Sequence, residues 1–421
     1  MKSKQTTAFP NKFLLPPLFG IFVLSRAGAQ QQTVQPLAPP VESISELNMT
    51  NAFQVFGAHP NASPPMPYEP FRWDQFVVRP HGDYQFIDAQ GLLAAPSNHV
   101  DSLVQNISPG LLVNLGPHWA FDYTFTLSLY SNTNFTTAYN QAITLTGQTV
   151  YTDWVFGFLQ TVDLSKSALI ESGGQTDEQI YTTAVTGHHE DSEYISEDLN
   201  IVQNIQNYSG TGFENTRTWS TTDWLNYQPQ SRFSLGLGPG IGYNNADFGP
   251  DSFFEQGQAR LNWRATQKLS FQLSGGVQET EFIGAGAGPD LFSPIYSGTI
   301  QYQPFSQTQI SLYGSRSVSP TLFVGEYTEM TTFGASFSQR LLGQFNVSVS
   351  GAYNDQRYVA SVESAIPSRT DKFYSLTLRL YHSFLERGTA SIFYEYGRDD
   401  STLSGYSFLS NQYGVEVSYS F

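Results

Sequence analysis

Hydrophobic and polar residues alternate along the last stretch of the chain, from Asn411 to Phe421. One face of an extended strand here carries apolar side chains: Tyr413, Val415, Val417, Tyr419 and Phe421. The other face carries small or polar residues: Gln412, Gly414, Glu416, Ser418 and Ser420. Because one face suits lipid and the other suits water, the pattern predicts the closing strand of a transmembrane β-barrel.

The same alternation recurs from Phe71 onward. Its runs are roughly ten to fourteen residues long, enough for a tilted strand to cross the apolar layer of a membrane. Clear runs begin at Phe233, Ala259, Leu269, Phe345 and Tyr374, with apolar residues at every second position. The fold class is therefore predicted to be all-β, a transmembrane antiparallel up-and-down β-barrel spanning residues 71–421.

The connections between the runs alternate between short turns and longer polar loops. Short turns are predicted near residues 116–118, 151–153, 190–192, 228–230, 265–267, 304–306, 341–343 and 384–386. Longer loops are predicted near residues 87–102, 131–137, 165–177, 208–215, 244–251, 281–292, 319–326, 360–368 and 399–408. This alternation predicts about eighteen strands, with sixteen as the alternative. A soluble β-sandwich or propeller would not need loops of two lengths in strict alternation.

The first 29 residues have the order of a secretory signal peptide. Lys2, Lys4 and Lys12 precede an apolar run over residues 13–24, and a small-residue cleavage site follows at residues 27–29. The run is too short to span a bilayer, and no later segment contains enough consecutive apolar residues for a membrane helix. Residues 30–70 are rich in Pro and are predicted to form a disordered periplasmic leader.

The composition agrees with an exported β-protein. The 421 residues are 15% aromatic and only 13% charged, and the chain has no Cys, which excludes disulfides and thiolate chemistry. The net charge of −16 argues against nucleic acid as a partner. No cofactor, metal site or catalytic residue is predicted.

Five charged residues are candidates to line the lumen, since each falls on the polar face of a run: Arg260, Arg264, Arg379, Glu395 and Glu416. Such residues can pair across neighbouring strands and brace the wall, or set a field that selects ions. Arg260 and Arg264 would attract anions.

Two further groups invite a chemical interpretation. Glycines alternate on the inward face of one run, from Gly236 to Gly242, which predicts close approach of an inward loop or strong bending. Residues 188–191 read His-His-Glu-Asp, and they are interpreted as a solvated turn in preference to a metal site. His382 and Ser383 are adjacent, so their side chains point to opposite faces of a strand and cannot form a catalytic dyad.

Three stretches resemble outer-membrane β-barrel porin families of Gram-negative bacteria. They are residues 108–111 before 116–119, residues 369–374, and the terminal strand from Asn411. The terminal alternation ending on Phe421 is also similar to the signal by which such barrels are recognised for assembly. Some relatives accompany exopolysaccharide or surface-protein export. The resemblance supplies no site residues.

Pattern and resemblance together predict a non-enzymatic outer-membrane channel for small polar solutes. The alternative is a plugged barrel that serves exopolysaccharide export or envelope structure. Expected partners are outer-membrane lipid with its lipopolysaccharide, the barrel-assembly machinery, and small polar solutes or polysaccharide.

Overall fold

The computed structural model describes residues 71–73, 75–95, 98–169, 174–210, 212–341, 345–362, 369–385, 387–403 and 405–420. The predicted signal peptide and leader, and the terminal Phe421 of the predicted assembly signal, lie outside these residues. No helix in the described part of the chain is long and apolar enough to cross a membrane.

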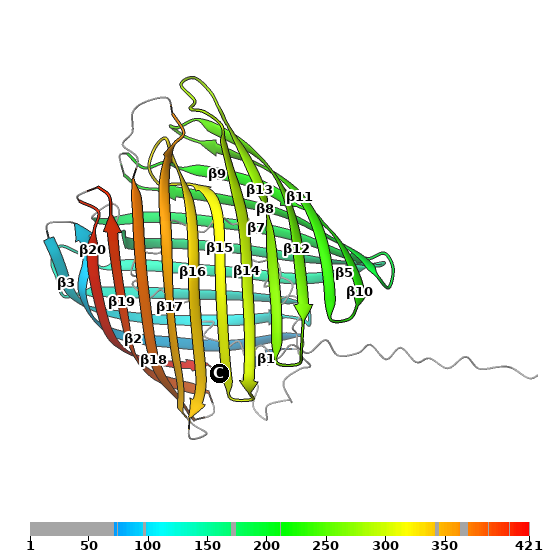
Figure 1. Cartoon of the computed structure of the whole chain (residues 1–421). Helices are drawn as coiled ribbons and strands as arrows, with labels where there is room; N and C mark the ends of the chain where they lie inside the picture. Colours follow the sequence, from blue (N-terminus) through cyan, green and yellow to red (C-terminus); the bar gives the residue numbers. More distant parts are fainter. Residues whose placement is uncertain are drawn as a thin grey trace, which may run out of the picture. The chain divides into compact units, whose positions relative to one another are not determined.

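Antiparallel strands make up nearly all of the described chain (Figure 1). In chain order they are β1 (Phe71–Trp73), β2 (Phe76–Ala95), β3 (Asn98–Leu115), β4 (Trp119–Tyr130), β5 (Ala138–Tyr151), β6 (Trp154–Leu169), β7 (Gly174–Glu190), β8 (Ile195–Tyr208), β9 (Thr216–Thr222), β10 (Trp224–Gln230), β11 (Phe233–Ala246), β12 (Asp251–Arg264), β13 (Leu269–Ile283), β14 (Leu291–Phe305), β15 (Thr308–Pro320), β16 (Glu326–Leu341), β17 (Phe345–Ala360), β18 (Thr370–Phe384), β19 (Gly388–Ser401) and β20 (Phe408–Ser420).

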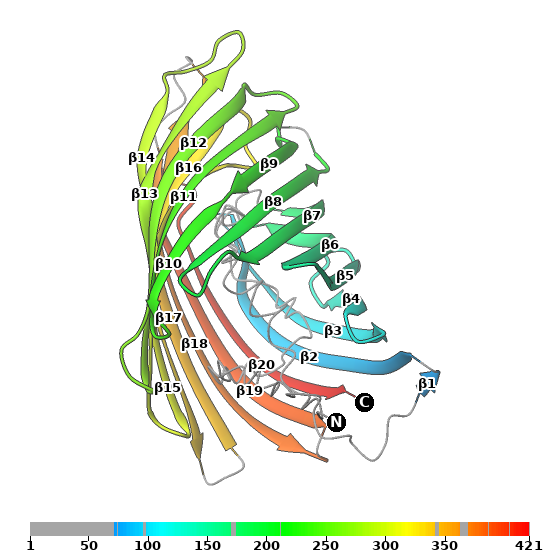
Figure 2. The same ribbon diagram turned by 90° about the vertical axis from the view of Figure 1, so that its right-hand side faces the viewer.

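The strands form a closed barrel of 18 strands, as the sequence predicts. Each strand pairs with its neighbour in the chain, and β20 pairs back onto β2 from His81↔Ser420 to Gln90↔Asn411. β1 forms only a short hairpin with the start of β2 (Figure 2). Closure pairs the first long strand of the described chain with the last, so neither is left as an open edge of the sheet, which is the condition for strands to span a membrane.

β9 and β10 are two parts of one transmembrane strand. Both pair with β8 and with β11 in one continuous register, and the break falls at Asp223. Pro239 of β11 lies opposite this residue and has no N–H to give to the ladder, although the Asp223 N–H still donates to the Pro239 carbonyl at 3.1 Å. The missing donor explains why the strand is interrupted there.

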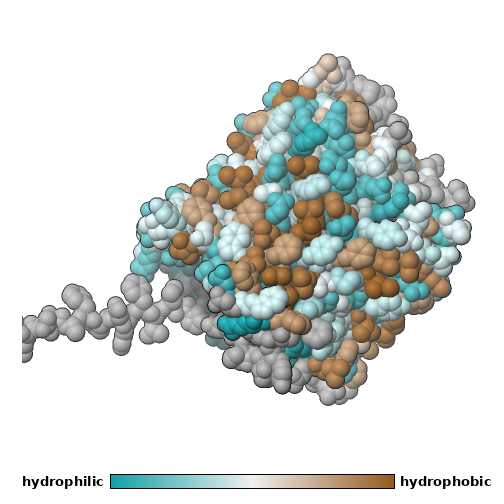
Figure 3. Space-filling model, turned by 180° about the vertical axis from the view of Figure 1, so that it is seen from behind, coloured by the Kyte–Doolittle hydropathy of each residue, from teal (hydrophilic) through white to brown (hydrophobic). Residues whose placement is uncertain are grey.

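The outer face of the barrel is apolar. Leu237, Ile201 and Ile392 expose 66%, 58% and 56% of their surface, whereas their chain neighbours on the inner face are buried or half-buried. Figure 3 shows hydrophobic side chains spread across the middle of one such face. Trp119, Trp219 and Tyr302 are exposed on this outer surface. Trp224 lies on the inner face, under Arg260.

Two predicted loops are mostly strand. β2 continues to Ala95 and β3 begins at Asn98, within the predicted loop 87–102, and β6 and β7 similarly extend through much of 165–177. Polar side chains alternate here without interrupting the ladder, as at Ser165↔Glu178 and Ser167↔Thr176. A polar strand above the apolar layer has the composition of a loop, so composition alone misassigned these segments.

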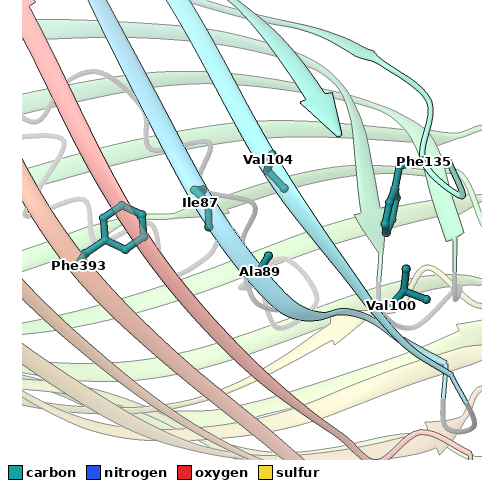
Figure 4. Packing of buried hydrophobic residues seen from close by; sticks show 6 residues of the cluster. All are labelled: Ile87, Ala89, Val100, Val104, Phe135 and Phe393. Carbon is teal, nitrogen blue, oxygen red and sulfur yellow. The ribbon is translucent and has the colours of Figure 1, made fainter. Parts of the chain in front are cut away.

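Apolar side chains also gather inside the barrel. One buried cluster lies on the inner wall (Figure 4). It consists of Ile87 and Ala89 of β2, Val100 and Val104 of β3, Phe393 of β19, and Phe135 between β4 and β5. A second cluster, built on Phe282, Val318 and Tyr327, joins β13 to the β15–β16 hairpin, although β13 is not a neighbour of either strand in the sheet. Within the described residues, the inner wall is therefore polar with these two apolar patches.

Candidate functional site

Arg260, predicted to line the lumen, lies in a hydrogen-bonded group on the inner wall that we call the His188 cluster: His188, Asp198, Trp224, Asn226 and Arg260. His188 Nδ1 and Asp198 Oδ1 are 2.6 Å apart, and the Arg260 guanidinium pairs with Asp198 Oδ2. Asn226 Nδ2 donates to the same carboxylate oxygen at 2.9 Å, and its Oδ1 accepts from Arg260 Nε at 2.8 Å. The charge of Arg260 is therefore neutralised within the wall.

Strand register brings this cluster together. His188 lies directly opposite Asp198, and Asp198 lies directly opposite Trp224. Arg260 comes from the far side of β11, and its side chain crosses that strand at Gly236, where an added Cβ would lie 2.9 Å from Arg260 Cγ. His188 thus belongs to a strand and not to a solvated turn, and the prediction for residues 188–191 is wrong at this residue.

The glycine row of β11 makes room for side chains of the neighbouring strands. A Cβ at Gly238 would lie 2.7 Å from the Trp224 ring, and one at Gly242 would lie 2.2 Å from the Phe254 ring. The guanidinium of Arg260 stacks over Trp224, 4.4 Å from the ring centroid. The close approach was predicted, but it comes from wall side chains and not from an inward loop.

The other three lumen candidates lie together in a second group, the Arg379 cluster: Asp83, Arg379, Phe393, Glu395 and Glu416. Arg379 Nη1 donates to Glu416 Oε2 at 2.6 Å, and its guanidinium lies 5.1 Å from the centre of the Phe393 ring. Phe393 occupies the space left by Gly414, where a Cβ would lie 2.2 Å from the ring. Asp83 and Glu395 both interact electrostatically with Arg379 and Glu416, so three carboxylates share one guanidinium.

The remaining sequence candidates take simpler positions. Arg264 ends β12 on the inner face, and within the described chain its guanidinium has no ion-pair partner. Tyr413, Val415 and Val417 of the predicted assembly signal point outward on β20 and expose 49%, 45% and 44% of their surface. Among the described residues, no group of three or more His, Asp or Glu side chains is placed to hold a metal ion.

The upper part of the β15–β16 hairpin bends into the barrel. Pairing of β14 with β15 stops at Tyr296↔Arg316, although both strands continue beyond that point. Tyr327 of β16 then reaches the inner face of the β11–β12 wall, where its hydroxyl accepts from Asn244 Nδ2 at 3.1 Å and also bonds to Ser252. Its ring packs edge-on against Phe282 of β13 with centroids 4.9 Å apart. In Figure 1 the upper end of β15 turns away from β14.

A buried ion pair supports the bend. Glu329, only 5% exposed, lies between the guanidinium of Arg316 at 3.1 Å and that of Arg357 at 3.6 Å. Ser293 of β14 donates its hydroxyl to the same carboxylate. The hairpin is therefore bound to its neighbours β14 and β17 as well as to the β11–β12 wall.

The hairpin tip is also bound to neighbouring loops at the long-loop end. The Glu214 N–H donates to the Leu322 carbonyl at 2.8 Å, and Phe213 and Phe323 form an isolated β-bridge. Arg369 stacks on Tyr358 at 3.6 Å and lies 5.7 Å from the Phe323 ring. These contacts join the β8–β9, β15–β16 and β17–β18 connections across one side of the mouth.

Alternation in the sequence did not reveal this hairpin. Tyr327 and Glu329 share a strand face with Phe333 and Phe337, which are exposed outward, so the pattern assigns them to the lipid side. The available signal was the charge, because Glu329 and Arg357 would be costly on a lipid-facing surface. Opposite charges on one nominally outer face could have indicated that the face turns inward.

The geometry establishes how the chain meets its surroundings. A closed ring of strands, apolar outside and polar or charged inside, satisfies its backbone internally and presents hydrocarbon-compatible side chains to lipid. The chain folds as a closed 18-strand antiparallel β-barrel, as the sequence predicts.

No protein-family model and no curated protein matches the sequence. Among solved structures, the barrel is similar to the outer membrane protein opdK from Pseudomonas aeruginosa, at 10% identity and a TM-score of 0.46, over 82% of this chain and 98% of that one. It is similar to OccAB3 of Acinetobacter baumannii at 9% identity and a TM-score of 0.46, over 82% and 99% of the two chains. The siderophore receptor PirA of the same species has 8% identity and a TM-score of 0.44, over 81% and 80%.

Proposed function

We propose that this barrel is a channel for passive or weakly selective passage of small polar solutes across the outer membrane. The observation that carries the proposal is the closed ring of 18 strands whose inner wall bears paired and unpaired charges. Rings of this strand number enclose an aqueous interior unless something fills it. No step of the proposal needs catalysis or a cofactor.

The inward hairpin sets the narrow part of the proposed pathway. It is tied to the β11–β12 wall through Tyr327 and to the β8–β9 loop through its tip, so it occupies part of the mouth. Solutes would pass beside it, along the wall that carries the Arg379 cluster. Arg379, Glu395 and Glu416 are proposed to set the field there, and their excess of carboxylates favours cations.

Two partner assignments complete the proposal. The long-loop end, where the mouth contacts gather, is proposed to face the lipopolysaccharide leaflet, since outer-membrane barrels carry their longer loops outside. The outward row from Tyr413 to Tyr419 is proposed to be read by the barrel-assembly machinery, together with Phe421.

Conductance in planar lipid bilayers tests the channel directly. Purified, folded protein is expected to give steady single-channel openings, and liposomes that contain it are expected to swell in small neutral sugars. Tyr327→Phe removes the hydroxyl that holds the hairpin and is expected to give larger or more variable openings. Tyr374→Phe is the matched control, because Tyr374 lies on the outer face and its hydroxyl makes no hydrogen bond in the described structure. If neither Tyr327→Phe nor Tyr374→Phe gives channel openings although both are folded, the proposal is contradicted.

The tethered mouth favours one second candidate, a barrel that is closed at rest and serves surface polysaccharide export or envelope structure. This alternative predicts that the wild-type protein does not conduct and that shortening the hairpin tip, residues 321–325, opens a pore. Conductance of the wild type alone is enough to reject it.

A further inference from the structure

Polar side chains form a band on the outer face of β6 to β10, where the barrel is otherwise apolar. The band consists of Gln160, Thr183, Gln203, Thr221 and Asp223. Strand register places Gln160 opposite Thr183 and Thr183 opposite Gln203, so these three share one face. That face is the outer one, because Val185 and Ile201 on the same strands expose 42% and 58% of their surface.

The band lies at one depth near the middle of the wall. Counted from the short-turn end, Gln160 is six residues into β6, Thr183 seven into β7 and Gln203 eight into β8, and Asp223 lies seven residues from the short-turn end of β10, just beyond that strand. Apolar or aromatic residues flank it above and below, as Tyr181 and Val185 do on β7. The band therefore belongs to the hydrocarbon layer and not to the interface.

On β18, β19 and β20 the outward residues at this depth are neither amides nor carboxylates. Leu378 is six residues from the short-turn end of β18, Tyr394 is six from that of β19, and Tyr413 is seven from that of β20. A lipid-facing wall thus needs no amide or carboxylate at this level, and the band requires its own explanation.

Only some of the polar groups in the band have a hydrogen-bond partner within the described chain. Thr183 donates to Gln160 Oε1 at 2.6 Å, and Thr221 donates to Asp223 Oδ1 at 3.0 Å. The amide of Gln203 makes no side-chain hydrogen bond within the described structure, although it lies between Ile201 and Ile205. Hydrocarbon offers it no partner either, and a carboxylate such as Asp223 is costly at this depth.

We propose that this band is the contact through which two copies of the chain associate in the membrane. A second copy inserted in the same orientation brings its own band to the same depth, so polar groups meet polar groups. Glutamine amides both donate and accept and threonine hydroxyls do the same, which makes the band complementary to itself. The Asp223 carboxylate accepts hydrogen bonds from amides of the facing copy. Interstrand polar contacts of this kind associate membrane segments that lipid cannot solvate.

Cysteine cross-linking tests the contact cleanly, since the chain contains no Cys. Ile201→Cys places a thiol beside Gln203 on the outer face, and Leu378→Cys places one on the apolar outer face of β18. In intact outer membranes treated with an oxidant, the first variant is expected to form a covalent dimer and the second is expected to stay a monomer. Equal cross-linking of both variants, or none at Ile201→Cys, overturns the proposal.

A second set of variants tests the role of the polar groups. Gln203→Leu with Thr183→Val, introduced into Ile201→Cys, is expected to reduce dimer formation at least tenfold. The heat-dependent shift in electrophoretic mobility shows in the same samples whether the barrel is folded. Folded protein that still cross-links at the original yield shows that the band does not hold the copies together.

Discussion

The two charge clusters of the inner wall are built on the same plan but reach opposite electrostatic results. In each, a glycine leaves space for an aromatic ring, and an arginine lies over that ring: Gly238, Trp224 and Arg260 in the His188 cluster, and Gly414, Phe393 and Arg379 in the other. One carboxylate, Asp198, receives Arg260 together with His188. Three carboxylates surround Arg379.

The difference teaches that an arginine on a polar strand face is not by itself an anion site. In the His188 cluster Asp198 neutralises the charge of Arg260, so Arg260 braces the barrel wall. In the Arg379 cluster three acidic side chains surround one guanidinium, and we propose that this surplus of acid leaves a negative field that a passing ion can sense. The neighbouring strands decide which role an arginine takes.

Removal of Asp198 should show the largest effect, because Arg260 would lose the one carboxylate it pairs with among the described residues while it stays largely buried. Asp198→Leu is expected to destabilise the barrel by about 3–5 kcal/mol, whereas Glu416→Leu should cost less since Asp83 and Glu395 still face Arg379. Urea titration of barrels folded in liposomes measures both. Equal costs would mean that the two clusters do not differ in the way described.

The glycine spaces should show the next largest effect. Gly238→Ala and Gly414→Ala are each expected to cost about 1–3 kcal/mol, because the new Cβ would overlap Trp224 or Phe393. Gly257→Ala is the matched control, since nothing lies within 4 Å of its Cβ position. A loss in the control as large as in the other two would remove the packing explanation.

Neutralising the surplus acid should change ion selectivity without unfolding the barrel. Glu395→Gln is expected to lower the ratio of cation to anion permeability roughly twofold, because one of three carboxylates near Arg379 is lost. Reversal potentials under a salt gradient give the ratio, with Ser391→Ala as a control that changes no charge, since the Ser391 hydroxyl lies 3.5 Å from Glu416 Oε2. An unchanged ratio would place the Arg379 cluster away from the conducting path.

Arg264 should have the smallest effect, because it is a single charge at the end of its strand and has no ion-pair partner in the described part of the chain. Arg264→Gln is expected to shift the reversal potential slightly toward cations, by less than Glu395→Gln shifts it in the opposite direction. Asn262→Ala on the same face serves as the uncharged control. A shift toward anions would contradict the position assigned to Arg264 in the lumen.

The sequence predicted the barrel well because alternation and turns are features of consecutive residues. Alternation in each run places Leu235, Leu237 and Ile241 outward, and the structure exposes all three. The division into short turns and long loops predicted the strand number for the same reason, since each turn is read from a few consecutive residues. The extended β2–β3 and β6–β7 segments were missed where polar strands resemble loops.

The site was less accessible to sequence reasoning, because it depends on contacts between distant strands. Alternation predicts that Arg260 faces inward, but the partners Asp198 and Asn226 follow only from the register of β8, β10, β11 and β12. Tyr327 and Asn244 are 83 residues apart, and their contact needs the bend in β15 and β16. No local pattern contains that bend.

Single-channel recording of the purified, folded barrel in planar bilayers tests the central claim most directly, because it asks whether the ring of strands encloses a water-filled path beside the inward hairpin. The account predicts steady openings with a modest preference for cations. Bilayers that stay silent with protein shown to be folded and inserted, both with and without the Tyr327→Phe exchange, would contradict it.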